Sequence, residues 1–159
     1  MDSSHETIDV RQDGRRVFVT LDRPEVLNAQ NEAFLRDFLD VTAGLAGRDD
    51  FDAVAVRSSC DHWGAGLDLK AAAEGWRLTA KTVEWWETAL RHLETIKQLV
   101  VALIDGYCLG GGLQLALACD LRSEIADTDN RDYRRGLIAR RDRLRALLDQ
   151  VGGPVVRTP

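Results

Sequence analysis

Apolar residues follow two different spacings along the chain, and the change of spacing predicts the first elements. Residues 7–11 and 16–21 are short β-rich stretches on either side of Asp13-Gly14, a dipeptide typical of a tight hairpin turn. After Asp22-Arg23-Pro24, which ends the second stretch, the spacing becomes helical from Asn31 to Gly47. The apolar face of this predicted helix consists of Phe34, Leu35, Phe38, Leu39, Thr42 and Leu45.

The order strand, glycine-rich turn and helix then occurs twice. Residues 53–57 have the pattern of a buried strand, and a glycine-rich turn follows at 63–70. Residues 79–97 form an amphipathic helix that carries Val83, Trp86, Leu90, Leu93 and Ile96. An apolar strand at 99–104 leads to a second glycine-rich turn at 105–112 and an apolar helix at 113–119. This alternation predicts an α/β fold with crossover helices.

The C-terminal residues have a different pattern. Between Thr128 and Gln150 there is no strand signal, and Gly152-Gly153-Pro154 ends the segment. Near-heptad spacing, with arginines in between, connects Leu137, Leu144, Leu147 and Val151. We expect an amphipathic helix that docks on its own domain or on another subunit; a basic helix for an acidic partner is the alternative. The predicted organisation is a core at 6–122 and a charged helical tail at 123–159.

Charge supports this division and limits the partners. The chain has 159 residues, 45% of them hydrophobic, and a formal net charge of −5. Residues 123–159 have a net charge of +2, which leaves −7 on the preceding residues. The hydrophobic fraction excludes intrinsic disorder, and the acidic body argues against a nucleic-acid partner, because nucleic-acid-binding proteins need a basic face.

Cysteine usage and the N-terminus indicate a compartment. Cys60, Cys108 and Cys119 lack metal-ligand spacing, so we expect reduced thiols and no metal site. Residues Met1 to Thr7 are polar and do not resemble a signal peptide. No apolar run approaches the ~20 residues that a membrane span needs. We therefore expect a cytoplasmic protein without membrane contact.

Neither glycine turn matches a phosphate-binding motif. Gly110-Gly111-Gly112 is followed by Leu113-Gln114 rather than by Lys-Ser/Thr, and Leu69 breaks the GxGxxG pattern after Gly64 and Gly66. The first N–H groups of a helix lack internal partners, and glycine lets a ligand approach the backbone. Two such turns that face each other form an oxyanion hole. Two tight turns that serve only packing are the alternative.

Four segments, in this order, resemble motifs of the crotonase superfamily, the enoyl-CoA hydratase/isomerase family. They are Leu21–Glu25 with Leu27-Asn28-Ala29, then Trp63–Lys70, Asp105–Gly112 and Ala118–Arg122. The resemblance covers residues 6–122 and does not extend to 123–159. It implies a crotonase-like α/β spiral of stacked ββα turns, here C-terminally shortened and followed by the predicted tail helix.

The resemblance also implies a ligand and roles for individual residues. The ligand would be an acyl-CoA thioester, and the backbone amides of Leu67 and Gly111 would hold its oxygen and stabilise an enolate. Coenzyme A would lie against Val26-Leu27 and the turn formed by Ala65, Gly66, Leu67 and Asp68. Coenzyme A belongs to the substrate, and no separate cofactor is expected. Family members suggest a trimer or hexamer, and apolar surface left uncovered by a short chain also favours a homo-oligomer.

One departure from the family pattern bears on activity. Gln114 stands where hydratases of the family carry a catalytic glutamate, and an amide is neither an acid nor a base. A second family glutamate has no counterpart, because Glu124 lacks the surrounding motif. The predicted function is a lyase or isomerase of fatty acid metabolism in which Gln114 orients water or substrate; a cofactor-free dioxygenase is a minor variant. The alternative is an inactive truncated homologue that binds CoA thioesters or serves as a partner subunit, or a chain that a second polypeptide completes.

Other residues near the turns have two interpretations each. Asp68 caps the following helix or contacts ligand, and His62 is a solvated loop residue or a catalytic one. Lys70 is solvated or meets a CoA phosphate. Trp85 and Trp86 point to different helix faces, so we expect packing or subunit contact, with an acyl pocket as the alternative.

Overall fold

The computed structural model describes residues 3–122 of the chain, as strands and helices that alternate. By their internal contacts the residues divide into two units, Met1–Leu121 and Arg122–Pro159, and the predicted tail helix lies outside the described residues. The strands are β1 (Ser3–Ser4), β2 (Ile8–Asp13), β3 (Arg16–Leu21), β4 (Ala53–Ser58), β5 (Leu99–Leu103) and β6 (Asp120–Arg122). The helices are η1 (Pro24–Val26), α1 (Glu32–Leu45), α2 (Leu69–Ala73), α3 (Ala80–Thr95) and α4 (Gly111–Ala118).

The strands form one six-stranded sheet in which the spatial order equals the order along the chain. β2 and β3 are antiparallel, and the pair Asp13↔Arg16 closes their hairpin beside Gly14, whose φ is +58°. β3, β4 and β5 are parallel, with Val17 opposite Val54 and Val54 opposite Val100. The predicted hairpin and the predicted parallel α/β arrangement are therefore confirmed.

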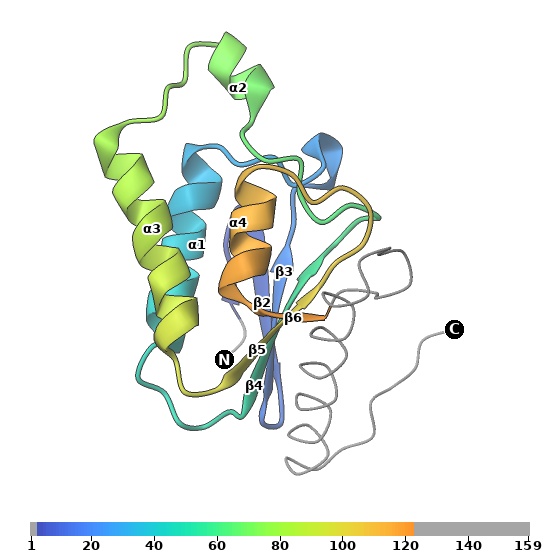
Figure 1. The fold of residues 1–159 in the computed structure, drawn as a ribbon, viewed down its shortest axis with the longest axis vertical. Coiled ribbons are helices and arrows are strands. Elements are labelled where there is room, and N and C mark those ends of the chain that lie inside the picture. Colours follow the sequence, from blue (N-terminus) through green and yellow to red (C-terminus); the bar gives the residue numbers. More distant parts are fainter. Residues whose placement is uncertain (1–2, 123–159) are drawn as a thin grey trace, which may run out of the picture. The chain divides into compact units, whose positions relative to one another are not determined.

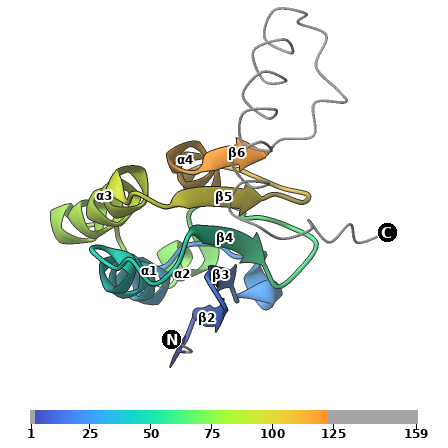
Figure 2. The same cartoon turned by 90° about the horizontal axis from the view of Figure 1, so that it is seen from below.

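The crossover helices cover one face of this sheet. α1 connects β3 to β4 and α3 connects β4 to β5, and both lie with α4 on the same side (Figures 1 and 2). α1 begins after Asn31, whose side chain accepts a hydrogen bond from the Phe34 N–H at 3.0 Å. α3 begins with a capping box between Thr79 and Thr82. The ends of both helices fall within two residues of the predicted ones.

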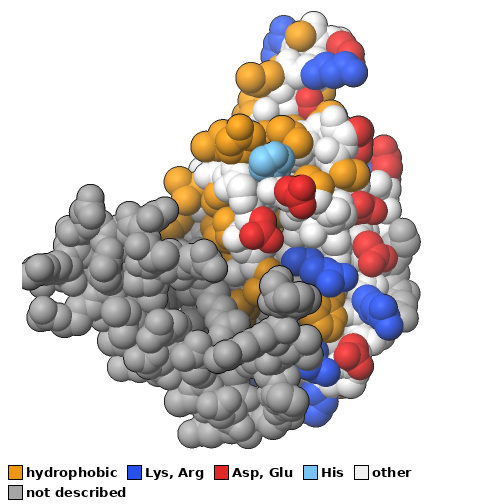
Figure 3. Space-filling view, turned by 90° about the vertical axis from the view of Figure 1, so that its right-hand side faces the viewer, with side chains coloured by type: hydrophobic (Ala, Val, Ile, Leu, Met, Phe, Trp, Pro, Cys, Tyr) orange, Lys and Arg blue, Asp and Glu red, His pale blue; other side chains and the backbone are white. Residues whose placement is uncertain are grey.

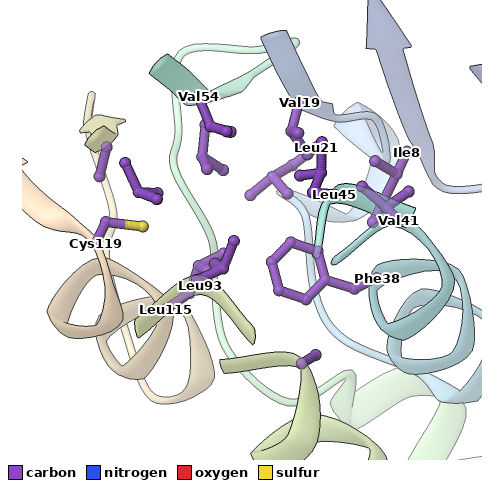
Figure 4. Close-up of a cluster of buried hydrophobic side chains, with 14 of the residues drawn as sticks. Ile8, Val19, Leu21, Phe38, Val41, Leu45, Val54, Leu93, Leu115 and Cys119 are labelled. Carbon is purple, nitrogen blue, oxygen red and sulfur yellow. The ribbon is translucent and has the colours of Figure 1, made fainter. Parts of the chain in front are cut away.

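The core lies between these helices and the sheet. Phe38 of α1 and Leu93 of α3 point toward side chains of the central strands, among them Val19 and Val54 (Figure 4). The Phe38 ring lies 5.9 Å from that of Phe34 and 5.5 Å from that of Trp86, so an aromatic group joins α1 to α3. Because the core side chains are apolar and almost fully buried, they hold the ends of the strands, and hence the loops that follow them, in fixed positions.

One short element near the loops, η1, was not predicted, and α4 begins earlier than predicted. The helix that Asp68 was predicted to cap is α2, in which the Asp68 carboxylate accepts a hydrogen bond from the Ala71 N–H at 2.9 Å; both η1 and α2 are too short for a periodic signal. α4 starts at Gly111 rather than at residue 113, because Gly111 and Gly112 of the glycine-rich loop are already helical. Gly111 is thus the first helical residue, whose N–H has no partner within the helix.

Several large apolar side chains remain at the surface. Figure 3 shows hydrophobic side chains gathered on the upper part of the face that it draws. On α4, Leu113 and Leu117 are 49% and 65% exposed. No helix among the described residues is long and apolar enough to cross a membrane. The expected homo-oligomer stays a prediction, for which this apolar surface supplies a reason.

Candidate functional site

The loops after β3 and β4 are joined by main-chain hydrogen bonds. The Gln30 N–H donates to the Gly66 carbonyl at 2.7 Å, and the Asp68 N–H donates to the Gln30 carbonyl at 2.9 Å. The Ala65 N–H donates to the Leu27 carbonyl at 3.0 Å. The two segments therefore lie side by side like a short parallel ladder, which fixes the course of the first glycine turn.

The second glycine turn is joined to the first one in the same way. The Gly64 N–H donates to the Tyr107 carbonyl at 2.8 Å, and the Leu109 N–H donates back to the Gly64 carbonyl at 2.9 Å. The indole N–H of the buried Trp63 donates to the Gly112 carbonyl at 2.8 Å. A Cβ added at Gly66, where φ is +84°, would lie 3.0 Å from the Leu109 carbonyl oxygen. The turns thus face each other at a distance that only glycine allows.

Among the described residues, several backbone amides of the two turns have no hydrogen-bond acceptor, and two of them belong to residues that line one cavity. In the stretch from His5 to Cys119 no acceptor faces the N–H of Leu67, although its neighbour Asp68 is bonded. The same holds for the Gly111 N–H at the start of α4. Both residues line one cavity. An oxyanion hole requires N–H donors, often at the positive end of a helix, that converge on one oxygen; for Leu67 and Gly111 this role stays a prediction.

The cavity is lined by residues of the first glycine turn, of α3 and of α4. Its volume is about 350 Å³ and most of its lining is apolar. Besides Leu67 and Gly111, it is lined by Gln30, Leu35, Leu78, Thr82, Val83, Trp86, Glu87, Leu90 and Gln114. Concave, mostly apolar sites with a few polar groups are typical of small-ligand binding. Apolar side chains of α3, those of Val83, Trp86 and Leu90, supply part of its lining.

The structure brings three predicted site residues, Leu67, Gly111 and Gln114, to this one cavity. The remaining predicted contacts, Val26, Leu27, Ala65, Gly66 and Asp68, belong to the neighbouring segments and are not among its lining residues. Trp86 lines the cavity and also packs in the core, whereas Trp85 lies half-buried with the Lys81 ammonium 4.8 Å from its ring. The packing interpretation is confirmed for Trp86, and the acyl-pocket interpretation stays a prediction.

Sequence reasoning missed three polar lining residues, Gln30, Thr82 and Glu87. Glu87 shares a helix face with Val83 and Leu90, at spacings of four and three, so the pattern contained a signal. Gln30 follows the Asn28-Ala29 motif directly, and nothing in the pattern indicates which way its side chain points. Its place in the cavity results from the pairing of the loops.

A buried ion pair ties the first turn to the loop after β3. Arg23 Nη1 lies 3.0 Å from Asp68 Oδ2, with side chains only 13% and 5% exposed, and Arg23 also donates to the Ala29 carbonyl. Burial opposes ionisation of Asp68, but hydrogen bonds from the Ala71 N–H and from Arg23 outweigh it and lower the pKa of the carboxyl. The predicted capping role of Asp68 is confirmed, and the ion pair adds a second role.

Asn28 holds the same corner through its side chain. It is 1% exposed and has a φ of +54°, and its oxygen accepts from the Arg23 N–H at 2.8 Å. Its amide nitrogen donates to Ser58 Oγ at 2.8 Å and to the His62 carbonyl at 3.2 Å. Asparagine fits this position because it tolerates a left-handed backbone conformation and because its side-chain amide can both accept and donate hydrogen bonds.

The Asn28→Ala variant is expected to lower the free energy of unfolding by about 1–3 kcal/mol, since it leaves buried partners without hydrogen bonds. Chemical denaturation followed by circular dichroism measures this. Asn28→Gly is the matched control, because it removes the same bonds without the backbone strain of alanine at positive φ. If both variants were as stable as the parent chain, Asn28 would have no anchoring role.

The other candidates lie away from the cavity lining. The His62 ring stacks on Tyr107 with centroids 4.4 Å apart, and its Nδ1 accepts from the Tyr107 N–H at 3.3 Å. This histidine therefore supports the second turn. Burial raises the pKa of the Cys108 thiol, which disfavours a nucleophilic thiolate. Among the described residues, no group of histidine, cysteine and carboxylate side chains is arranged to hold a metal.

Comparison with known proteins identifies a family and several relatives. The profile of the Enoyl-CoA hydratase/isomerase family matches residues 15–140. The chain is 32% identical over 118 residues to the probable enoyl-CoA hydratase echA8 of Mycobacterium bovis, covering 74% of this chain and 46% of that protein. It is 30% identical over 135 residues to the mitochondrial Delta(3,5)-Delta(2,4)-dienoyl-CoA isomerase of Mus musculus, covering 76% and 41%.

Solved structures give the same result for the fold. An enoyl-CoA hydratase/carnithine racemase from Magnetospirillum magneticum superposes with a TM-score of 0.67 at 28% identity, covering 76% of this chain and 46% of that one. AtuE of Pseudomonas aeruginosa superposes with a TM-score of 0.65 at 29% identity, covering 72% and 46%. The chain spans about half the length of the curated relatives that it matches.

Proposed function

The chain belongs to the enoyl-CoA hydratase/isomerase family, and from this premise we propose that it binds an acyl-CoA thioester and polarises the thioester carbonyl through the Leu67 and Gly111 amides. The observation that carries the proposal is the pair of N–H groups without acceptors on Leu67 and Gly111, two residues that line one cavity. The acyl chain extends along the apolar wall formed by α3. Coenzyme A lies outside the cavity, against Val26-Leu27 and the turn from Ala65 to Asp68.

Polarisation at this position favours an enolate. When a proton leaves the carbon next to the thioester carbonyl, negative charge develops on the carbonyl oxygen, and preorganised N–H donors stabilise that charge. The reaction class that fits is therefore proton abstraction or transfer next to a thioester, as in lyases and isomerases. Gln114 takes part through hydrogen bonds to water or substrate and not through proton transfer.

A second candidate function has its own support. Gln114, an amide in place of a catalytic acid at the cavity, favours a homologue that binds CoA thioesters without turnover, or that serves as a partner subunit. The two functions share the binding site and differ in whether a proton is transferred.

Calorimetric titration with crotonyl-CoA and with free coenzyme A tests the shared part. We expect micromolar affinity for the thioester and weaker binding of free coenzyme A, since only the thioester carbonyl reaches the two amides. A protein that unfolds cooperatively and binds neither ligand, or both equally, would contradict the proposal. Gln114→Glu separates the two functions: hydration of crotonyl-CoA by this variant indicates an intact site that lacked only its acid, and binding without hydration favours the non-catalytic homologue.

A further inference from the structure

A hydrogen bond joins α3 to the start of α4. The indole Nε1 of Trp86 donates to Gln114 Oε1 at 2.8 Å, and Gln114 lies in the first turn of α4, which begins at Gly111. Glu87 follows Trp86 in α3 and lines the same cavity as Gly111 and Gln114. The hydrogen bond therefore holds the turn of α3 that carries Glu87 beside the helix end that carries the Gly111 amide.

Glu87 is the one ionisable side chain among the described residues that line the cavity. The other polar side chains of the lining are the amides of Gln30 and Gln114 and the hydroxyl of Thr82. An amide is neither an acid nor a base, and the Thr82 hydroxyl donates to the Thr79 carbonyl at 3.1 Å within the cap of α3. Of the described lining residues, Glu87 is therefore the one whose side chain is suited to take up a proton.

The Glu87 carboxylate has no structural partner within residues 3–122. Neither a hydrogen bond nor an ion pair joins it to another described side chain. Its side chain is exposed, although it also belongs to the cavity lining. A carboxylate that meets both a ligand site and water can take a proton from a ligand and exchange that proton with the solvent.

We propose that Glu87 is the general base that removes a proton from carbon 2 of the acyl-CoA thioester. The carboxylate forms an O–H bond to this proton while the C–H bond breaks, and the electron pair of the C–H bond forms a double bond between carbons 1 and 2. The thioester oxygen takes the negative charge, next to the Leu67 and Gly111 amides. The neutral Glu87 carboxyl then returns a proton to the enolate, so the step needs no further reactant. This inference rests on the proposed function, since it concerns the proton that leaves the same ligand.

Exchange of protons with heavy water tests this step without the need for net turnover. Because Glu87 is exposed, a proton that it removes is replaced from the solvent before it returns, so deuterium should accumulate at carbon 2. The probe is 3-hexenoyl-CoA, whose enolate is conjugated with the carbon–carbon double bond and therefore forms more readily than that of a saturated chain. Mass spectrometry of the recovered acyl group counts the deuterium. We expect the parent chain to introduce it faster than buffer alone does.

Two variants of α3 assign the exchange to one carboxylate. Glu87→Gln keeps the size of the side chain and removes the base, so we expect it to slow the exchange by about 10²–10⁴-fold. Calorimetry with 3-hexenoyl-CoA should give an affinity close to that of the parent chain. Glu84→Gln is the matched control: Glu84 is exposed on the same helix, three residues earlier, and is not among the residues that line the cavity. It removes the same charge and should leave the exchange unchanged.

The outcomes separate this inference from the function on which it rests. If 3-hexenoyl-CoA binds better than free coenzyme A but the parent chain gives no exchange, the inference is wrong and thioester binding stands. Exchange that survives Glu87→Gln, or that falls equally in Glu84→Gln, also overturns it. If the thioester binds no better than free coenzyme A, both proposals fail together.

Discussion

Replacing Asp68 with alanine is expected to lower the free energy of unfolding by about 3–5 kcal/mol, because it leaves the buried Arg23 guanidinium without its counter-ion. The Arg23 and Asp68 side chains are 13% and 5% exposed, so water replaces little of the lost interaction. The substitution also removes the N-cap of α2, where Asp68 accepts from the Ala71 N–H. Urea denaturation of the parent chain and the variant measures the difference.

A surface variant is the control for Asp68→Ala, and the contribution of Asp68 to stability depends on pH. Asp52→Ala removes the partner of Arg15 at the surface, where the side chains are 58% and 28% exposed, and should change stability little. Because the folded state lowers the pKa of Asp68, its contribution is present above the ordinary carboxyl pKa and is lost as pH falls through the folded value. Asp68→Asn should therefore lose less stability on acidification than the parent chain. Equal losses for Asp68→Ala and Asp52→Ala would contradict the role of the buried pair.

Gly111→Pro is expected to slow any reaction that passes through the enolate by about 10²–10³-fold, because it removes one of the two oxyanion donors. Proline has no N–H, and it is favoured at the first position of a helix, which Gly111 occupies in α4. The same change should weaken the preference for a thioester over free coenzyme A. It should also abolish the red shift that polarisation of an aromatic enoyl-CoA produces in its absorption spectrum, a measurement that needs no turnover.

Gly111→Ala is the matched control for this experiment. Alanine and proline both place a Cβ against the Gln30 side chain, but only alanine keeps the N–H. The amide at Gly111 has no oxyanion role if alanine and proline reduce binding and spectral shift equally. A red shift that persists in Gly111→Pro, with the fold verified by circular dichroism, would lead to the same conclusion.

Local spacing was sufficient to predict the elements that carry the site. The hairpin around Gly14 follows from its turn residues, and α1 and α3 follow from apolar residues on one face. That the two glycine turns face each other was predicted from their residue types alone. In the structure, main-chain hydrogen bonds join Gly64 of the first turn to residues 107–109 of the second. η1 and α2 lie within one or two helical turns, which is too short for periodicity to reveal.

The composition of the cavity could not be predicted from local spacing. Trp86 and Gln114 are 28 positions apart, and their hydrogen bond exists because α3 and α4 pack together on one face of the sheet. Gln30 enters the cavity because its main chain pairs with Gly66 and Asp68. Such contacts depend on tertiary packing, and the sequence of a single chain carries no direct signal for them.

The order of the strands determines when the site is completed during synthesis. Each strand of the sheet pairs with the one that precedes it in the chain, so the sheet can grow by adding one strand at a time as the ribosome extends the polypeptide. The Leu67 amide emerges well before the Gly111 amide. When only the Leu67 amide has left the ribosome, the nascent chain already contains most of the strands of the described part, but it has only one of the two proposed N–H donors. If the proposed site binds its ligand through both amides, binding by a nascent chain reports on the emergence of α4, the last helix of the described part, and not on formation of the sheet.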